Sequence, residues 1–150
     1  MLTNLEHLGL AVRDLAAATD LYTRLLGQPP YKTEHVPSEA VDTVFFQVGG
    51  SKIELLAGAS PDSAITKFLE KKPEGIHHVA FEVDDIEAEM ARLRAEGFTL
   101  LNEKPKRGAD NKLVCFVHPK SAGGVLVELC QTADLTNETD GADTPAPRAG

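Results

Sequence analysis

The sequence predicts an α+β fold built from two tandem β-α-β-β-β modules. The main observation is an internal repeat, because His7–Leu15 matches His78–Ile86 at a constant offset of 71 residues. Each copy begins with a strand-like apolar run and then reaches an aspartate, a residue that caps helix N-termini well. A length of 150 residues fits one domain with its own core. We expect a single domain at 1–131, made of a first module (5–56), a linker (57–75) and a second module (76–131).

The first module begins with a strand through Leu8, Leu10 and Val12, and Asp14 then caps a helix. Apolar residues recur at helical spacing until Gly27, which ends the helix. Further strands are expected at 43–48 and 52–56 on either side of a Gly-Gly-Ser turn, with a weaker candidate at 31–36. The residues that form the apolar side of the helix are Leu15, Ala18, Tyr22, Leu25 and Leu26.

The second module repeats this order. Asp85 caps a helix whose apolar positions include Ile86, Met90 and Leu93, and Gly97 ends it. Strands are expected at 112–117 and 125–130, with a weaker candidate at 99–102. The linker contains a short helix at 63–71 behind a Ser-Pro-Asp breaker. The segment 132–150 has almost no apolar residues, which predicts a disordered tail.

Composition excludes several classes of protein. The net charge is -8, from 15 basic and 23 acidic residues, whereas a general nucleic-acid binder presents a basic face. No apolar run is long enough to span a bilayer, and the first residues do not resemble a secretory signal. Cys115 and Cys130 lie in strand-like runs and are expected to be reduced core residues. We therefore expect a cytoplasmic protein with no nucleic-acid or membrane partner.

Strand alternation selects two histidines as candidate ligands. In the first strand of each module, alternate side chains lie under the helix and the others face the opposite side. His7 and Gly9 take the opposite side in the first module, as do His78 and Ala80 in the second. The small neighbours leave room for a ligand beside each histidine. His77 falls on the bulky face, so alternation favours His78 over His77.

The same alternation selects two carboxylates. Glu54 and Glu128 each lie in the middle of an apolar strand and face away from the core side chains. A carboxylate in that position is costly to bury unless it is paired or bound to a metal. Together with His7 and His78, the two glutamates form a donor set of two nitrogens and two oxygens. Such a set suits one borderline divalent ion, such as Zn, Ni, Co or Mn.

Weaker candidates lie elsewhere in the chain. Glu34, His35 and Glu39 occupy a polar stretch before the strand at 43–48, and one of them could act as an acid or base. A basic cluster on this acidic protein could capture a phosphorylated ligand, or it could be a solvated loop. Its members are Lys104, Lys106, Arg107 and Lys112.

These residues carry a resemblance to a known family. The paired modules resemble the vicinal oxygen chelate superfamily, and the chain from Leu5 to about Gln131 is similar to the methylmalonyl-CoA epimerase family within it. The most specific stretches are KIELL at 52–56, residues 60–65 and 67–69, GIHH at 75–78 and HPKSAGGVLVEL at 118–129. The resemblance implies that the two modules form one curved mixed sheet around a metal cleft. It further implies that the metal is bound by His7, Glu54, His78 and Glu128. It also implies interconversion of the two C2 epimers of methylmalonyl-CoA, a CoA-thioester substrate, and a homodimer.

An epimerase needs a base on each face of the carbon. By resemblance Glu128 is one base, and the other is a glutamate just before the second strand of the first module. Glu39 is the nearest match, although this stretch is about one residue shorter than the family pattern, and Glu34 is the alternative. Two other functions stay open: lactoylglutathione lyase, which uses a similar ligand set, and a metal-free small-molecule-binding protein of the same fold.

Overall fold

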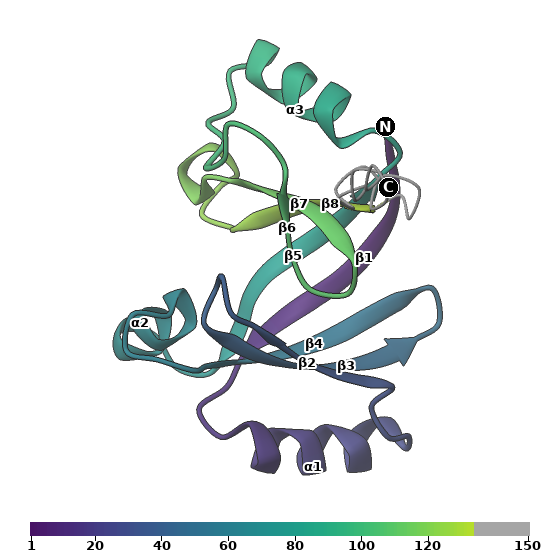
Figure 1. Cartoon of the computed structure of the whole chain (residues 1–150), viewed down its shortest axis with the longest axis vertical. Helices are drawn as coiled ribbons and strands as arrows, with labels where there is room; N and C mark the ends of the chain where they lie inside the picture. The colour runs from purple at the N-terminus through teal and green to yellow at the C-terminus, as the bar shows by residue number, and fades with distance from the viewer. Residues whose placement is uncertain (134–150) are drawn as a thin grey trace, which may run out of the picture.

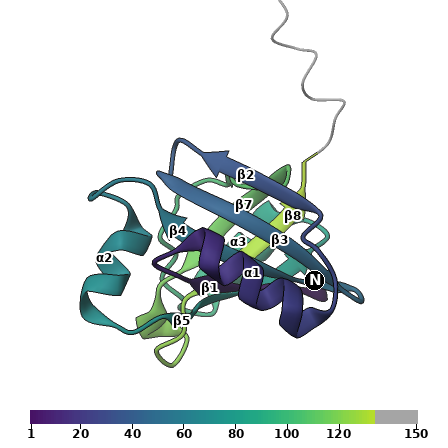
Figure 2. The ribbon, with the colours of Figure 1, turned by 90° about the horizontal axis from the view of Figure 1, so that it is seen from below.

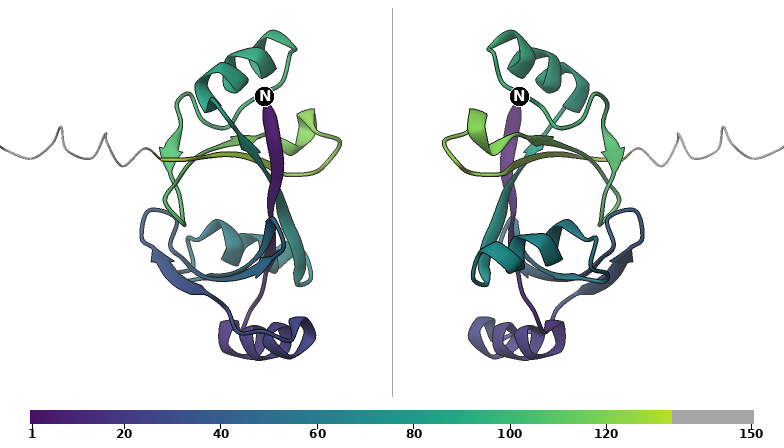
Figure 3. Two further views of the ribbon diagram at one scale, coloured as in Figure 1. Left: turned by 90° about the vertical axis from the view of Figure 1, so that its right-hand side faces the viewer. Right: turned by 90° about the vertical axis from the view of Figure 1, so that its left-hand side faces the viewer.

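A computed structural model describes residues 1–133 as one eight-stranded mixed sheet with helices packed around it (Figure 1). The strands follow the order β2-β3-β4-β1-β5-β8-β7-β6 and curl into a half-barrel, which is clearest in Figure 3. The first half of the chain contributes β1 (Leu2–Ala11), α1 (Leu15–Leu26), β2 (Lys32–Val36), β3 (Val41–Val48) and β4 (Ser51–Gly58). The second half contributes β5 (Gly75–Val83), α3 (Ile86–Ala95), β6 (Lys106–Arg107), β7 (Lys112–Val117), the short 3-10 helix η1 (Pro119–Ser121) and β8 (Val127–Thr132). Between the halves lies α2 (Ala64–Lys71).

The sequence repeat becomes an approximate twofold symmetry of the sheet. β1 pairs in parallel with β4, and β5 pairs in parallel with β8. The two halves meet where β1 and β5 run antiparallel to each other. The predicted α+β fold with a curved mixed sheet is confirmed.

Helix positions follow from capping and from the apolar faces. Asp14 and Asp85 accept hydrogen bonds from the first turns of α1 and α3, as their spacing predicts, and Ser63 does the same for α2. The helices α1 and α3 cover the outer face of the sheet at opposite ends of the molecule, and Figure 2 shows α1 against its own half. Leu25 was expected on the apolar side of α1 but is 68% exposed, so the buried stripe of this helix is narrower than predicted.

Several element boundaries differ from the expectation. The candidate strand at 99–102 is wrong, because Leu100 forms only an isolated bridge. The second strand of this half is instead the short β6. β8 begins two residues later than predicted and extends to Thr132. Ala133, placed in the predicted tail, is 5% exposed and donates its backbone N–H to the carbonyl of Asn111. The prediction of disorder for 134–150 lies outside the described residues.

Within residues 1–133 no helix is long and apolar enough to cross a membrane. Cys115 and Cys130 are buried free thiols, as expected for core residues.

Candidate metal centre and active-site cleft

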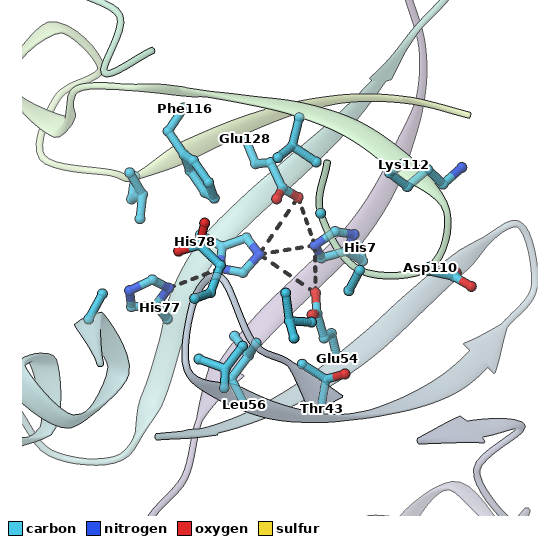
Figure 4. Close-up of a pocket in the computed structure, with 18 of the residues that line it drawn as sticks. His7, Thr43, Glu54, Leu56, His77, His78, Asp110, Lys112, Phe116 and Glu128 are labelled. Atoms are coloured by element: carbon cyan, nitrogen blue, oxygen red, sulfur yellow. Dashed lines mark hydrogen bonds and ion pairs between the residues drawn. The ribbon is translucent and has the colours of Figure 1, made fainter. Parts of the chain in front are cut away.

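The inner side of the half-barrel holds a cleft of about 370 Å³. Its floor is formed by the central strands β1, β4, β5 and β8, and the N-terminal end of α2 borders one end. Much of its wall is apolar, with Leu56, Ile65, Phe116 and Leu126 among the lining residues. Polar side chains gather at its centre (Figure 4).

The sheet register brings two histidines and two glutamates to this centre. Along the β1–β5 seam, His7 lies opposite Ala80 and His78 lies opposite Gly9, so the two imidazoles approach each other diagonally. On the outer sides of this seam, Gly9 pairs with Glu54 in β4 and Ala80 pairs with Glu128 in β8. The four donor side chains thus occupy symmetry-related positions on the four central strands.

The donor atoms lie within a few ångströms of one another. His7 Nε2 lies 2.9 Å from Glu54 Oε2, 3.0 Å from Glu128 Oε2 and 3.0 Å from His78 Nε2. His78 Nε2 lies 3.8 Å and 3.9 Å from the same two carboxylate oxygens. All four side chains are at most 9% exposed.

This donor set fits a divalent cation. With bonds of about 2.1 Å, neighbouring donors at right angles lie roughly 3.0 Å apart and opposite donors roughly 4.2 Å apart. The observed distances of 2.9 to 3.9 Å fall within that range. Glu128 Oε2 is buried and, apart from its ion pair with His7, has no hydrogen-bond partner among the described residues, so a cation would satisfy it. The group of His7, Glu54 and His78 could hold a metal ion by proximity alone.

The electrostatics of the cluster favour one positive charge at its centre. Burial lowers the pKa of His7, but the carboxylates of Glu128 and Glu54 raise it by more. Burial lowers the pKa of His78, which keeps that imidazole neutral. The two carboxylates thus stabilise a single positive charge between them, which a bound cation would also supply.

The two candidates for a second base differ in position. Glu39 lines the cleft from the β2–β3 turn, and its carboxylate forms an ion pair with Lys106. Glu34 is absent from the cleft lining in the part of the chain that the structure describes. Its carboxylate instead pairs with Lys32 and accepts a hydrogen bond from the backbone N–H of Asp110. His35 is also directed elsewhere, since it contacts Asp42 at 2.7 Å with about half of both side chains exposed.

The chain is similar to a known superfamily and to named proteins within it. Residues 6–116 match the model of the Glyoxalase/Bleomycin resistance protein/Dioxygenase superfamily. The mitochondrial methylmalonyl-CoA epimerase of Mus musculus is 43% identical over 131 residues, which cover 87% of this chain and 74% of that protein. The ethylmalonyl-CoA/methylmalonyl-CoA epimerase of Cereibacter sphaeroides is 42% identical over 133 residues, covering 87% of this chain and 99% of that protein. The chain belongs to the methylmalonyl-CoA epimerase family.

A solved structure of the family extends the comparison to the fold. A variant of the Streptomyces coelicolor epimerase in complex with 2-nitronate-propionyl-CoA is 34% identical and superposes with a TM-score of 0.86. The match covers 89% of this chain and 100% of that one.

Three features of the cleft differ from what the sequence pattern predicts. His77 was expected on the bulky face but lines the cleft, and its Nδ1 lies 2.9 Å from His78 Nδ1. Glu6, which no sequence pattern singles out, is 4% exposed and also lines the cleft. The room expected beside Gly9 is filled by the His78 ring, because a Cβ on Gly9 would lie 2.1 Å from His78 Cε1.

Glu6 belongs to a buried ionic network beside the donor cluster. Lys52 Nζ lies 2.8 Å from Glu6 Oε1 and 2.8 Å from Asp110 Oδ2. Burial raises the pKa of Glu6, but His7 and Lys52 lower it by more, to about 2. Because Asp110 comes from the β6–β7 loop, the network fastens the second half of the chain to the first across the cleft.

The four basic residues expected to form one surface cluster are separated in the structure. Lys104 and Arg107 are exposed, and Lys106 pairs with Glu39 at the cleft. Lys112 is 8% exposed, because its position at the start of β7 directs it inward, where Nζ lies 2.9 Å from Thr132 Oγ1 and 3.9 Å from Glu6 Oε2. The four residues therefore do not form one surface cluster, and their role in holding a substrate tail stays a prediction.

Proposed function

We propose that the chain interconverts the two C2 epimers of methylmalonyl-CoA in the cleft, using one divalent metal ion. The observation that carries the proposal is the convergence of His7, Glu54, His78 and Glu128 at the centre of a cleft with an otherwise largely apolar wall. The identity to named methylmalonyl-CoA epimerases, over nearly nine tenths of the chain, supports the substrate. Lactoylglutathione lyase and a metal-free binding protein are not favoured by these relatives.

In this proposal the four side chains at the centre hold the ion. Bound there, Co, Mn, Ni or Zn supplies Lewis-acid stabilisation of the charge that develops on the thioester oxygen as C2 loses its proton. The apolar side chains of Leu56, Ile65 and Phe116 exclude water and so strengthen electrostatic interactions within the cleft. A volume of about 370 Å³ suits the acyl head of the substrate, with much of the CoA moiety outside.

Two carboxylates on different walls exchange the proton. Glu128, on β8, serves one face of C2, and Glu39, on the opposite wall formed by the first half of the chain, serves the other. Lys106 forms an ion pair with Glu39 and so holds that carboxylate at the cleft. Glu39 is preferred to Glu34, whose carboxylate is held by Lys32 and the backbone of Asp110.

The test follows both epimerisation and exchange at C2. Each isolated epimer of methylmalonyl-CoA is incubated in deuterium oxide with the metal-loaded chain, and both the epimer ratio and the deuterium content at C2 are measured. Glu39→Gln should bind metal normally and lose epimerisation by on the order of 10²-fold or more, the usual contribution of a positioned acid–base group. It should still exchange the C2 proton of one epimer, because Glu128 is unchanged.

Glu34→Gln is the matched control, because it alters a nearby carboxylate on the same half of the chain that lies off the cleft. It should epimerise like the wild type. Full activity in Glu39→Gln would remove Glu39 from the mechanism. Loss of exchange from both epimers would assign Glu39 a supporting role instead. Association into a homodimer is part of the same proposal, and light scattering coupled to size-exclusion chromatography measures it.

A further inference from the structure

The pairing of β1 with β5 is irregular at three places, and two of them are equivalent in the repeat. One extra residue stands immediately before His7 in β1, and another stands immediately before His78 in β5. The extra residues are Glu6 and His77, which are related by the same offset as the histidines. A β-bulge takes its extra residue out of the regular alternation and redirects its side chain. Both residues consequently line the cleft, next to the histidine that follows.

Glu6 faces Nδ1 of His7, the outer ring nitrogen, which points away from the donor cluster. The two side chains are 5% and 7% exposed, and Glu6 Oε1 lies 3.8 Å from His7 Nδ1. His7 Nδ1 is buried and has no hydrogen-bond partner among residues 1–133. The separation exceeds a hydrogen bond, but a shift of about 1 Å would form one. Since Nε2 of His7 faces the donor cluster, Nδ1 is the nitrogen that must carry the proton for His7 to act as a ligand.

His77 makes the equivalent contact with His78. The two Nδ1 atoms lie 2.9 Å apart, a hydrogen-bond distance, and Figure 4 shows this contact on the side of His78 away from the donor cluster. If His78 Nδ1–H donates to His77 Nδ1, the lone pair of His78 Nε2 is left to face the cleft. The ring of His77 packs edge-on against Phe68, with centroids 4.9 Å apart, and this holds its orientation.

We propose that Glu6 and His77 are paired positioning residues, which hold the outer nitrogens of His7 and His78 and so fix the orientation and tautomer of both metal-binding histidines. The inference rests on the metal site of the proposed function. Histidine ligands in proteins usually donate their second ring N–H to a carboxylate, a carbonyl or another acceptor, and loss of that partner lowers metal affinity by about 10–100-fold. In this chain each partner is the bulged residue that precedes its ligand.

The two supports differ in strength. Glu6 is an anion, stabilised by Lys52 Nζ at 2.8 Å and by Lys112 Nζ at 3.9 Å. Hydrogen bonds to a charged acceptor are roughly twice as strong as those between neutral groups. Removal of Glu6 should therefore weaken metal binding more than removal of His77.

The first experiment titrates the metal-free full chain with Co²⁺ or Zn²⁺ alone by calorimetry. Glu6→Ala and His77→Ala should each weaken binding by about 10–100-fold, with the larger loss for Glu6→Ala. Two control variants match them in residue type. Glu89→Ala removes another glutamate that is 4% exposed, on α3, and His118→Ala removes the cap of η1. Both controls should bind metal like the wild type, and thermal unfolding reports the folding of every variant.

A second measurement separates positioning from general packing. Imidazole ¹⁵N–¹H spectra of the zinc-loaded chain report the tautomer of each histidine. Glu6→Ala should alter the Nδ1 signals of His7 and leave those of His78, and His77→Ala should do the reverse. Glu6→Gln and His77→Gln, which keep an acceptor, should recover part of the affinity and give folded chains if the alanine variants are unstable.

The outcomes are distinguishable. Wild-type metal affinity and unchanged histidine tautomers in folded Glu6 and His77 variants would overturn the inference while leaving the metal site intact. If the wild type binds no more metal than His78→Ala, the proposed metal site fails, and the inference fails with it. Equal losses in the Glu89 and His118 controls would show that burial, not the contact with the ligand, determines the effect, and would also overturn the inference.

Discussion

Gly9→Ala tests the packing between the two histidines directly. A Cβ at this position would lie 2.1 Å from Cε1, 2.4 Å from Nδ1 and 2.6 Å from Nε2 of His78. Ordinary contact begins at about 3.4 Å, so the His78 ring must retreat by about 1.3 Å to make room. Metal–ligand distances tolerate about 0.2 Å, and the substitution should therefore remove His78 from the donor set and weaken metal binding by at least about 100-fold.

The fold should survive this change. Overpacking of a core typically costs about 1–3 kcal/mol, and replacement of glycine by alanine within a strand returns about 0.5–1 kcal/mol. Calorimetric titration with Zn²⁺ measures the affinity, and urea unfolding of the metal-free chain measures the stability. Gly50→Ala is the control, because a Cβ there meets nothing within 4 Å. Wild-type metal affinity in a folded Gly9→Ala chain would refute the reasoning, since it would mean that His78 can move without leaving the site.

Three further predictions concern the rest of the molecule. Asp110→Asn should lower stability at pH 7 by about 1–3 kcal/mol, less than for a fully buried pair because the side chain is 19% exposed. Burial raises the pKa of Asp110, but Lys52 lowers it by more. The stability that the Asp110 carboxylate contributes is therefore present above pH ~4 and is lost as the pH falls through its lowered folded pKa. The unfolding free energies of wild type and variant should converge at that low pH. Lys104→Ala with Arg107→Ala should raise KM for the CoA thioester at low salt with little change in kcat, and an unchanged KM would show that these exposed charges do not steer the substrate. Met90→Ala, at a position 1% exposed in the α3 core, should cost about 2–5 kcal/mol in urea unfolding, and a smaller loss would mean that the core collapses into the space.

Much of the architecture follows from local chemistry that the repeat presents twice. Asp14 and Asp85 cap the two outer helices as their spacing predicts. The short helix behind the Ser-Pro-Asp breaker is also where the sequence places it. Strands whose pairing depends on distant partners were less predictable. β6 has only two residues and exists because Lys106 and Arg107 meet β7, which no local pattern in 99–107 indicates.

The residues of the candidate site also divide into those that local sequence predicts and those that depend on distant pairing. Strand alternation is sufficient to direct His7 and His78 to one face, because each strand is regular after the histidine. Strand alternation places His77 on the wrong face and does not place Glu6 in the cleft. The reason is that a bulge shifts the alternation of side chains between the two faces by one residue. A bulge depends on the register with the neighbouring strand, and that register is set by contacts between residues far apart in the sequence. In the sequence, these two residues are linked by the repeat offset, which relates Glu6 to His77.

The two bulged residues make the cleft chemically different at its two ends. The repeat places a bulged residue before each histidine, but one is an acid and the other an imidazole. Glu6 requires a cation to be buried, and Lys52 and the Asp110 loop meet that requirement with an ionic network that closes one end. His77 requires no counter-charge and packs instead on Phe68 beside α2, so the other end is lined largely by apolar groups. A pseudo-symmetric set of donors therefore lies in an asymmetric cleft. A substrate with one anionic end and one thioester end meets a different surface on each side of the proposed metal site.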